Sequence, residues 1–258
     1  MKIRAKNRSV ASKFQLLAIR SVQKLAGLLP RATGIALATW DEAVVREPKD
    51  SERCVEIPWV ASGIARSLGL WLDIGYAHAE PRYWESIPMR TLRFGFGLDI
   101  AQPKFEQHPL QIEVTSDLIK EDLQLLPQFS LITCISTLEH IGCDNQIYHA
   151  QAGREEEPFK IQKEVLTKLL FKLAPRGYLM LSLPFGKFQD HGGFLQYDAD
   201  LIDSLKAAAL RTGKTIVSEK YYKLAPEGWV QCPREEMKDV AYRFEEYRAA
   251  GVVLLELT

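Results

Sequence analysis

From residue 70 onward, short apolar runs alternate with longer segments of helical periodicity, and this alternation restricts the chain to few folds. Runs suited to buried strands occupy residues 70–74, 94–99, 110–114, 130–135, 177–183, 215–220 and 252–257, and helical periodicity covers residues 159–173 and 198–211. Strands that alternate with helices pair in parallel, because each helix returns the chain to the same edge of the sheet. The pattern predicts a doubly wound α/β fold with a mostly parallel, seven-stranded sheet.

Composition agrees with a globular domain of this kind. Of the 258 residues, 47% are hydrophobic and 26% are charged, which is enough apolar surface for one large core. No uncharged apolar run reaches the roughly 20 residues that a membrane-spanning helix needs. The four cysteines are scattered without a C-x-x-C pair. This argues against a zinc ribbon or a secreted disulfide framework and favours a reducing cytoplasm.

The N-terminal segment carries a charge asymmetry. The first forty residues hold eight Lys or Arg and no acid before Asp41, whereas the whole chain balances 33 basic against 33 acidic residues. Apolar residues recur at helical spacing from Phe14 to Leu29, and Pro30 ends the pattern, which predicts a basic amphipathic helix. Such a helix could cover the active site, lie on a membrane surface or belong to an organelle transit peptide. We expect residues 1–50 to form this extension and its linker, and residues 51–258 to form the main domain.

Acidic residues end three successive strands of the predicted sheet. Asp73 ends the first and is followed by a turn at Gly75, Asp99 ends the second, and Asp117 follows the third. Ligands of open α/β sheets lie beyond the carboxyl ends of the strands, and an acid in the position of Asp99 can accept hydrogen bonds from both hydroxyls of a ribose. Asp117 can meet an exocyclic amine, with Leu118 beside the ring. A single acid could be a helix cap or a turn residue, but three in succession indicate a ligand site.

Several motifs together resemble those of class I S-adenosylmethionine-dependent methyltransferases. Residues 72–75 (LDIG) resemble the first motif, residues 97–100 (GLDI) the second, and residues 116–118 (SDL) the third. The segment 134–142 (CISTLEHIG) closely resembles the one that follows the fourth strand of that family. Residues 56–59 (EIPW), 196–198 (QYD) and 228–229 (GW) are similar to a branch associated with bacterial surface-glycan gene clusters. The resemblance covers about residues 52 to 257.

The resemblance implies a cofactor, S-adenosyl-L-methionine, and a role for each matching position. It places Gly75, Tyr76 and Ala77 at the methionine part, Asp99 at the ribose, Asp117 and Leu118 at the adenine, and Ser136 and Thr137 under the methyl-bearing sulfonium. Asp73 and Ile100 are further candidates for binding the cofactor. The residue types suit that cofactor, because acids and turns rich in carbonyl groups can bind its diol, its adenine, its amine and its cationic sulfur.

The sequence departs from the family pattern at three places. Ala77 and Ala79 replace two glycines of the first motif, with bulky Tyr76 and His78 between them, so close backbone approach to a ligand is expected to be harder. The fourth strand opens with a serine, residue 130, instead of the usual acid. Arg176 stands where the family has the second glycine of a Pro-Gly-Gly turn. These departures leave open a non-catalytic relative.

Three residues are candidates for the catalytic base. His140 lies in the LEHIG segment and titrates near neutral pH, which suits removal of a proton from an acceptor. The alternative is that His140 and Glu139 only cap or pack the start of a helix. His191, in the loop after the fifth strand, and Tyr197 are the other candidates. No metal site is expected, because the polar residues after Gly142 interrupt the helix that would align His140 with Asp144.

The sequence therefore predicts a methyltransferase that acts on a hydroxyl or amine of a small-molecule or sugar acceptor. The alternative is a scaffold of the same fold that binds a partner or a membrane surface through its basic N-terminal helix. A nicotinamide-dependent oxidoreductase is disfavoured, because no glycine follows Gly75 until Gly95 and the G-x-G-x-x-G pattern is missing. Nucleic acid is not expected as a partner, since basic charge is confined to the tail. The sequence leaves the oligomeric state open.

Overall fold

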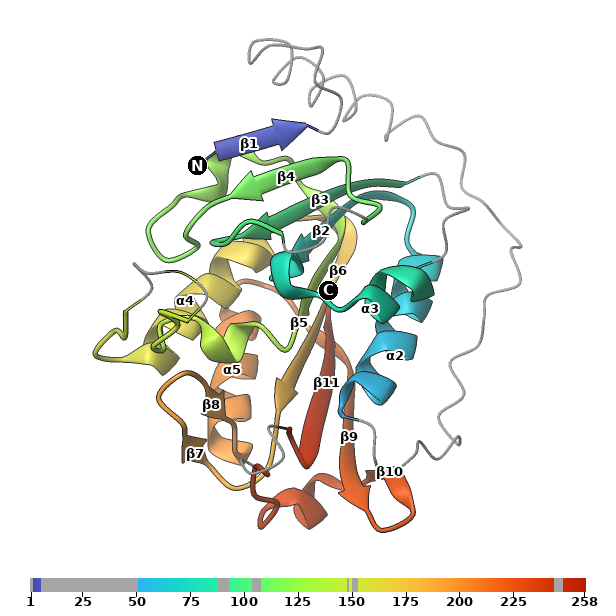
Figure 1. The fold of residues 1–258 in the computed structure, drawn as a ribbon, viewed down its shortest axis with the longest axis vertical. Coiled ribbons are helices and arrows are strands. Elements are labelled where there is room, and N and C mark those ends of the chain that lie inside the picture. The colour runs from blue at the N-terminus through green and yellow to red at the C-terminus, as the bar shows by residue number, and fades with distance from the viewer. Residues whose placement is uncertain are drawn as a thin grey trace.

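The computed structural model describes residues 2–5, 51–87, 93–103, 108–147, 149, 153–243 and 248–258. Its centre is a nine-stranded sheet with the strand order β1-β4-β3-β2-β5-β6-β11-β9-β10 (Figure 1). The strands are β1 Lys2–Ala5, β2 Gly69–Ile74, β3 Arg93–Asp99, β4 Ile112–Thr115, β5 Phe129–Ile135, β6 Leu173–Pro184, β9 Ile216–Ala225, β10 Gly228–Cys232 and β11 Gly251–Leu257. All seven strands predicted from the sequence are present, and β1 and β10 extend the two edges.

The sheet is mostly parallel. Strands β4, β3, β2, β5 and β6 pair in parallel, whereas β11 runs antiparallel between β6 and β9. The chain winds from β2 towards one edge through β3 and β4, and then returns to the other side of β2 with β5. Ligands bind where the winding reverses in this way, so the carboxyl ends of β2 and β5 mark the expected site. The predicted doubly wound α/β fold is confirmed.

Helices cover both faces of the sheet (Figure 1). On one face, α2 (Arg53–Arg66) and α3 (Pro81–Ser86) contribute to an apolar cluster that includes Trp71 and Leu131. On the other face, α4 (Pro158–Phe171) and α5 (Ala199–Arg211) pack in a cluster with Leu72 and Ile132. Because successive side chains of a strand point to opposite faces, β2 and β5 are apolar on both sides, as the continuous apolar runs predicted.

Short elements at the strand ends shape the site. They are the 3-10 helices η1 (Tyr76–His78), η2 (Leu123–Leu125), η3 (Leu138–His140) and η4 (Arg234–Met237), and the two-stranded hairpin of β7 (Gln189–Asp190) and β8 (Leu195–Gln196). The LEHIG segment therefore forms one 3-10 turn after β5, where the resemblance implied the head of a longer helix.

Some parts of the structure differ from the sequence prediction. Helix α2 was not predicted, because Pro58 lies inside it and interrupts its pattern. Strand β6 begins four residues before the predicted range, and β9 continues into a hairpin with β10. The predicted helix from Phe14 to Leu29 and the linker up to residue 50 lie outside the described residues. In the part of the chain that the structure describes, no helix is long and apolar enough to cross a membrane.

Candidate functional site

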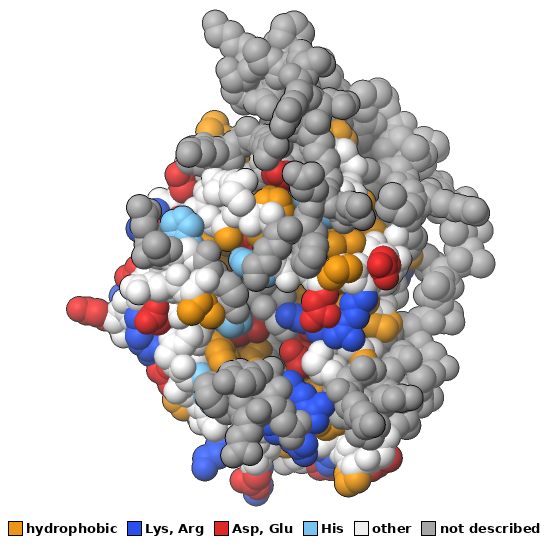
Figure 2. Space-filling model, viewed as in Figure 1, with side chains coloured by type: hydrophobic (Ala, Val, Ile, Leu, Met, Phe, Trp, Pro, Cys, Tyr) orange, Lys and Arg blue, Asp and Glu red, His pale blue; other side chains and the backbone are white. Residues whose placement is uncertain are grey.

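A cavity of about 320 Å³ lies beyond the carboxyl ends of β2, β3, β4 and β5. The predicted cofactor residues that line it are Asp73, Gly75, Tyr76, Asp99, Ile100, Asp117, Leu118, Ser136 and Thr137. Ala77 is buried behind the lining. On one face of the molecule, acidic, basic and histidine side chains lie close together (Figure 2). The sequence-predicted positions from four strands are thus brought to one place by the topology of the sheet.

Asp99 is held rigidly at the end of β3. One of its carboxylate oxygens accepts a hydrogen bond from the Ala77 amide at 3.0 Å, and the other accepts one from the Ala101 amide at 2.9 Å. The side chain lines the cavity although the residue is only 8% exposed, and burial raises the pKa of Asp99. Two amides therefore orient an acceptor with lone pairs left for a diol.

The bulky side chain of Tyr76 packs in the core and leaves the turn at Gly75 open. It is buried, and its ring lies against Gly97 of β3, where an added Cβ would come within 2.6 Å of the ring. The ring also meets His108 edge to face, with 5.4 Å between the centroids. Sequence analysis expected Tyr76 to hinder backbone approach to a ligand, but glycine on the neighbouring strand makes room for most of the ring in the core.

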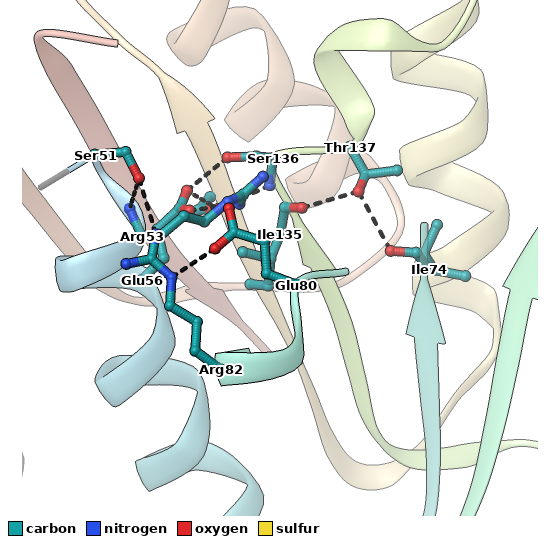
Figure 3. A network of polar contacts seen from close by, with 10 residues as sticks. Ser51, Arg53, Glu56, Ile74, Glu80, Arg82, Ile135, Ser136 and Thr137 are labelled. Carbon is teal, nitrogen blue, oxygen red and sulfur yellow. Dashed lines mark hydrogen bonds and ion pairs between the residues drawn. The ribbon is translucent and has the colours of Figure 1, made fainter. Parts of the chain in front are cut away.

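Gly75 is required by its conformation and by its neighbour. Its φ of 82° lies in the left-handed region, and a Cβ at this position would overlap the side chain of Thr137. The Thr137 hydroxyl donates to the carbonyl oxygens of Ile135 at 2.9 Å and Ile74 at 3.3 Å, so it is fixed between the ends of two strands (Figure 3). The first motif, residues 72–75, and the segment 134–142 after β5 therefore meet at a position that only glycine can occupy.

Asp73 presents an unusual buried carboxyl group. One oxygen accepts hydrogen bonds from the Thr133 hydroxyl at 2.6 Å and the Tyr83 hydroxyl at 3.2 Å. The other oxygen is buried and has no hydrogen-bond partner among the residues that the structure describes. Burial raises the pKa of Asp73 from 3.8 to about 7. A buried oxygen without a hydrogen-bond partner costs free energy of folding unless a ligand supplies a donor. The Asp73 carboxyl group in the cavity wall is therefore suited to bind a hydrogen-bond donor, and best a cationic one.

The far end of the cavity contains the third motif. The Asp117 carboxylate accepts from the Ile119 amide at 3.0 Å and pairs with the Lys120 amine at 3.2 Å. Leu118 is buried in the cavity wall, and the buried hydroxyl of Ser116 has no partner in the described ranges. An apolar side chain next to two polar groups suits the face and the edge of a heterocyclic base.

Sequence reasoning missed one functional group, the pair of Arg53 and Glu56 at the start of α2. Glu56 is fully buried, and its carboxylate accepts from the Arg53 guanidinium at 2.6 Å, the Ser136 hydroxyl at 2.7 Å and the Ser182 hydroxyl at 2.6 Å (Figure 3). Arg53 lines the cavity. The signal was an arginine and a glutamate three residues apart, a spacing that becomes informative only once a helix is expected there.

Ser136 combines this network with backbone strain. Its φ of 41° is in the left-handed region, which disfavours residues with a Cβ. The strain is maintained because the Ser136 amide donates to the Ser182 hydroxyl at 3.0 Å while its own hydroxyl donates to Glu56. Strained residues held by surrounding contacts are typical of functional sites.

The three predicted catalytic residues are not brought together. His140 lines the cavity, and burial lowers its pKa. His191 lies outside the lining, where its ring stacks on Phe194 at 4.6 Å. Tyr197 is fully buried, and its hydroxyl donates to the Gln162 side chain at 2.6 Å. The prediction for Tyr197 must be corrected, because a phenol enclosed in the core cannot contact an acceptor in this cavity.

The histidine and acidic side chains near η3 do not form a metal centre. Glu139 is buried and absent from the cavity lining, and burial raises its pKa well above the ordinary value. A search of the described ranges finds no cluster of three His, Cys, Asp or Glu side chains that could hold a metal. Glu139 therefore lies outside the cavity, among the buried residues of η3.

No protein-family model and no curated protein sequence matches the chain. Among solved structures it is similar to a 1,6-didemethyltoxoflavin-N1-methyltransferase of Burkholderia thailandensis with bound S-adenosylhomocysteine, at 12% identity over 99% of this chain and 93% of that chain, with a TM-score of 0.48. The N-methyltransferase NodS of Bradyrhizobium japonicum is 14% identical over 93% and 96% of the two chains, with a TM-score of 0.46. A methyltransferase of Leishmania major is 14% identical over 80% and 73%, with a TM-score of 0.48. The bound ligands belong to those proteins.

Proposed function

We propose that the chain is an S-adenosylmethionine-dependent methyltransferase that acts on a hydroxyl or amine of a small-molecule or sugar acceptor. One observation carries the proposal: a single cavity contains the Asp99 carboxylate, which can accept hydrogen bonds from a diol, together with the Asp73 carboxyl group and the Arg53 guanidinium. The last two groups can bind the ammonium and the carboxylate of a zwitterion. A nucleoside joined to an amino acid has both features. A nicotinamide dinucleotide has no amino-acid group.

The residues fit each part of this cofactor. The unpartnered oxygen of Asp73 would accept from the ammonium, and the Arg53 guanidinium would bind the carboxylate. Asp99 would hold the ribose, while Ser116, Asp117 and Leu118 would surround the adenine. The lining has more acidic than basic residues. The basic residues are Arg53 and Lys120, and the acidic residues are Asp73, Glu80, Asp99, Asp117 and Glu155. This excess favours a ligand with a net positive charge, such as a sulfonium zwitterion.

His140 would act as the base of the reaction. The bound cofactor supplies a methyl group that is already activated, so the protein must chiefly orient the acceptor and remove its proton. The Nδ1 atom of His140 lies 2.9 Å from the carbonyl oxygen of Gly193, and a carbonyl can only accept a hydrogen bond. The neutral ring then carries its proton on Nδ1 and its lone pair on Nε2. A lowered pKa keeps His140 neutral and able to take a proton at Nε2.

The test is a calorimetric titration of the full chain with S-adenosylmethionine, S-adenosylhomocysteine and NAD. We expect micromolar binding of the first two, no binding of NAD, and loss of binding in the Asp99→Ala variant. The matched control is Asp203→Ala, because Asp203 lies on α5 away from the cavity and is half exposed. Absence of binding by the folded wild-type protein would reject the enzyme and favour the non-catalytic scaffold.

A further inference from the structure

We propose that the β7–β8 hairpin is a positioning element for His140, in which the Gly193 carbonyl sets the tautomer of the ring and the ion pair of Arg154 and Asp190 holds that carbonyl in place. The inference rests on the proposed function, since it concerns the residue that would accept the acceptor's proton. It assigns a role to Arg154, Asp190 and Gly193, none of which lines the cavity.

The tip of the hairpin is fixed to the segment that follows His140. The Arg154 guanidinium makes two hydrogen bonds to the Asp190 carboxylate, at 3.1 Å and 2.5 Å, and a third to the Gly192 carbonyl at 3.0 Å. Asp190 also accepts from the Gly192 amide at 2.9 Å, and the Asp144 amide donates to the Gly192 carbonyl at 2.9 Å. Partial burial alone would raise the pKa of Asp190, but the bonds from Arg154 and Gly192 outweigh it and lower that pKa.

The base of the hairpin is anchored in the core. Gln196 of β8 is fully buried, and its amide donates to the Lys187 carbonyl at 2.8 Å and the Val240 carbonyl at 2.9 Å. With both ends held, Gly193 has little freedom to move relative to His140. A Cβ on Gly193 would come within 3.2 Å of the Asp144 carbonyl oxygen, so the tip lies close against that segment.

The surroundings of the His140 ring explain why its hydrogen-bond partner matters. The groups near the ring are the Gly193 carbonyl, the Phe194 ring with 5.5 Å between the centroids, Asn145, and the positive charge of Arg53. Burial is the main reason for the lowered pKa of His140, and the hairpin supplies part of that burial. Release of the hairpin would expose the ring and remove the acceptor from Nδ1, so the proton could move to Nε2 and block the proposed base.

The experiment is an NMR pH titration of the full chain with ¹⁵N-labelled histidine, in which a His140→Asn variant assigns the His140 signals. In the wild type we expect the Nδ1-protonated tautomer and a pKa below the ordinary value of about 6.5. In Arg154→Ala we expect a mixture of tautomers, which is the deciding readout, because reduced burial raises the pKa of His140 whereas loss of the Gly193 hydrogen bond lowers it. Reversal of the pair in Arg154→Asp with Asp190→Arg should move the spectrum back towards that of the wild type, but only in part, because the bonds of Arg154 and Asp190 to Gly192 are lost.

The matched control is Arg234→Ala. Arg234 also makes two hydrogen bonds to one carboxylate, that of Asp203, but this pair joins α5 to η4 away from His140. The control should leave the tautomer and pKa of His140 unchanged. If Arg154→Ala has the same tautomer and pKa as the wild type, or if Arg234→Ala shifts them equally, the inference is wrong.

A second variant and a second readout separate this inference from the proposed function. Asp190→Asn removes the charge with little change in shape, so it tests the ion pair even if Arg154→Ala fails to fold. Binding of S-adenosylhomocysteine should persist in Asp190→Asn within about threefold of the wild type, since neither residue of the pair lines the cavity. A tautomer change together with absent cofactor binding in the wild type would uphold the positioning of His140 and reject the methyltransferase.

Discussion

Asp73 and Asp99, at the ends of β2 and β3, differ from Asp203 and Glu219, on α5 and β9, in what balances their charge. The first two are less than 10% exposed and are surrounded by hydroxyls and amides, with no ion pair in the described ranges. Asp203 bonds to Arg234 at 2.8 Å, and Glu219 bonds to Lys206 at 2.8 Å. The Arg234 hydrogen bond lowers the pKa of Asp203, whereas burial raises the pKa of Asp73 and Asp99.

This difference separates paired acids, which can stabilise the fold, from buried acids that form no ion pair in the described ranges. A paired carboxylate on the surface costs little to bury partly and contributes modestly to stability. A buried carboxyl group without a cation opposes folding at neutral pH, and the fold keeps it only where another part of the sheet supplies enough stability. The carboxyl ends of the parallel strands therefore hold buried acids that have no ion pair in the described ranges, whereas the acids of α5 and β9 are paired.

The largest effect is expected for Asp73→Asn. The folded state keeps a proton on Asp73 up to a pKa of about 7, whereas the unfolded state loses it near 3.8, so this residue makes stability fall as pH rises between those values. At pH 8 the variant should be more stable than the wild type by up to about 4 kcal/mol, and the gain should vanish near pH 4. Urea denaturation at both pH values measures this, and calorimetry should show weaker S-adenosylmethionine binding. A variant that is less stable at pH 8 would contradict the comparison.

Gly75→Ala tests whether the cavity end of the sheet tolerates a side chain. We expect a loss of roughly 2–3 kcal/mol in the free energy of unfolding, from the positive φ and the overlap with Thr137. Gly213→Ala is the control, because Gly213 has a similar φ of 77° with open space around its Cβ position. It should lose only about 1 kcal/mol. Equal losses would show that the contact with Thr137 has no energetic weight.

Asp203→Asn tests the structural side of the comparison. We expect a loss of less than about 1 kcal/mol at pH 7, because the ion pair with Arg234 is partly exposed. The folded-state pKa of Asp203 is lowered, so its contribution is present above the unfolded value of 3.8 and is lost as pH falls below it. Thermal unfolding at pH 7 and pH 2 measures this. Any weakening of S-adenosylmethionine binding would show that the two regions are coupled.

Arg176→Gly should have the smallest effect. Ser136 and Arg176 are the non-glycine residues with positive φ in the described ranges, and Arg176 lies on the surface with a φ of 64°. Relief of this strain, reduced by the greater entropy of glycine in the unfolded chain, should stabilise the protein by about 0.5 kcal/mol without changing cofactor binding. A change in binding would mean that the backbone conformation of Arg176 affects the site.

The candidate acids could be predicted from the sequence because they lie at or shortly after the ends of apolar runs. Asp73 and Asp99 lie in the last two positions of their runs, and Asp117 follows the third run by three residues, so parallel pairing brings all three to one edge of the sheet. His140 was proposed from the resemblance of residues 134–142 to the family segment. Tyr197 was wrongly predicted to be accessible to an acceptor. It directly follows β8, and no local sequence feature there distinguishes a buried phenol from an exposed one.

Contacts between distant segments could not be predicted. Glu56 reaches Ser136 across 80 positions of the chain, and Gly193 reaches His140 across 53. Lys2–Ala5 lie before the segment Phe14 to Leu29 for which a helix was predicted, and they form an edge strand antiparallel to β4. Edge pairing depends on backbone groups that β4 leaves available, and no side-chain pattern records them.

The sequence by itself determined the α/β architecture, the seven central strands and the acids at their ends, because hydrophobic periodicity and strand-end polarity are local properties. Only the tertiary structure decided which acids are paired, where Arg53 lies, and which groups surround the ring of His140. Those properties depend on burial and on partners that the fold brings from other elements, since the charge state of a group is set by the dielectric and the hydrogen bonds around it.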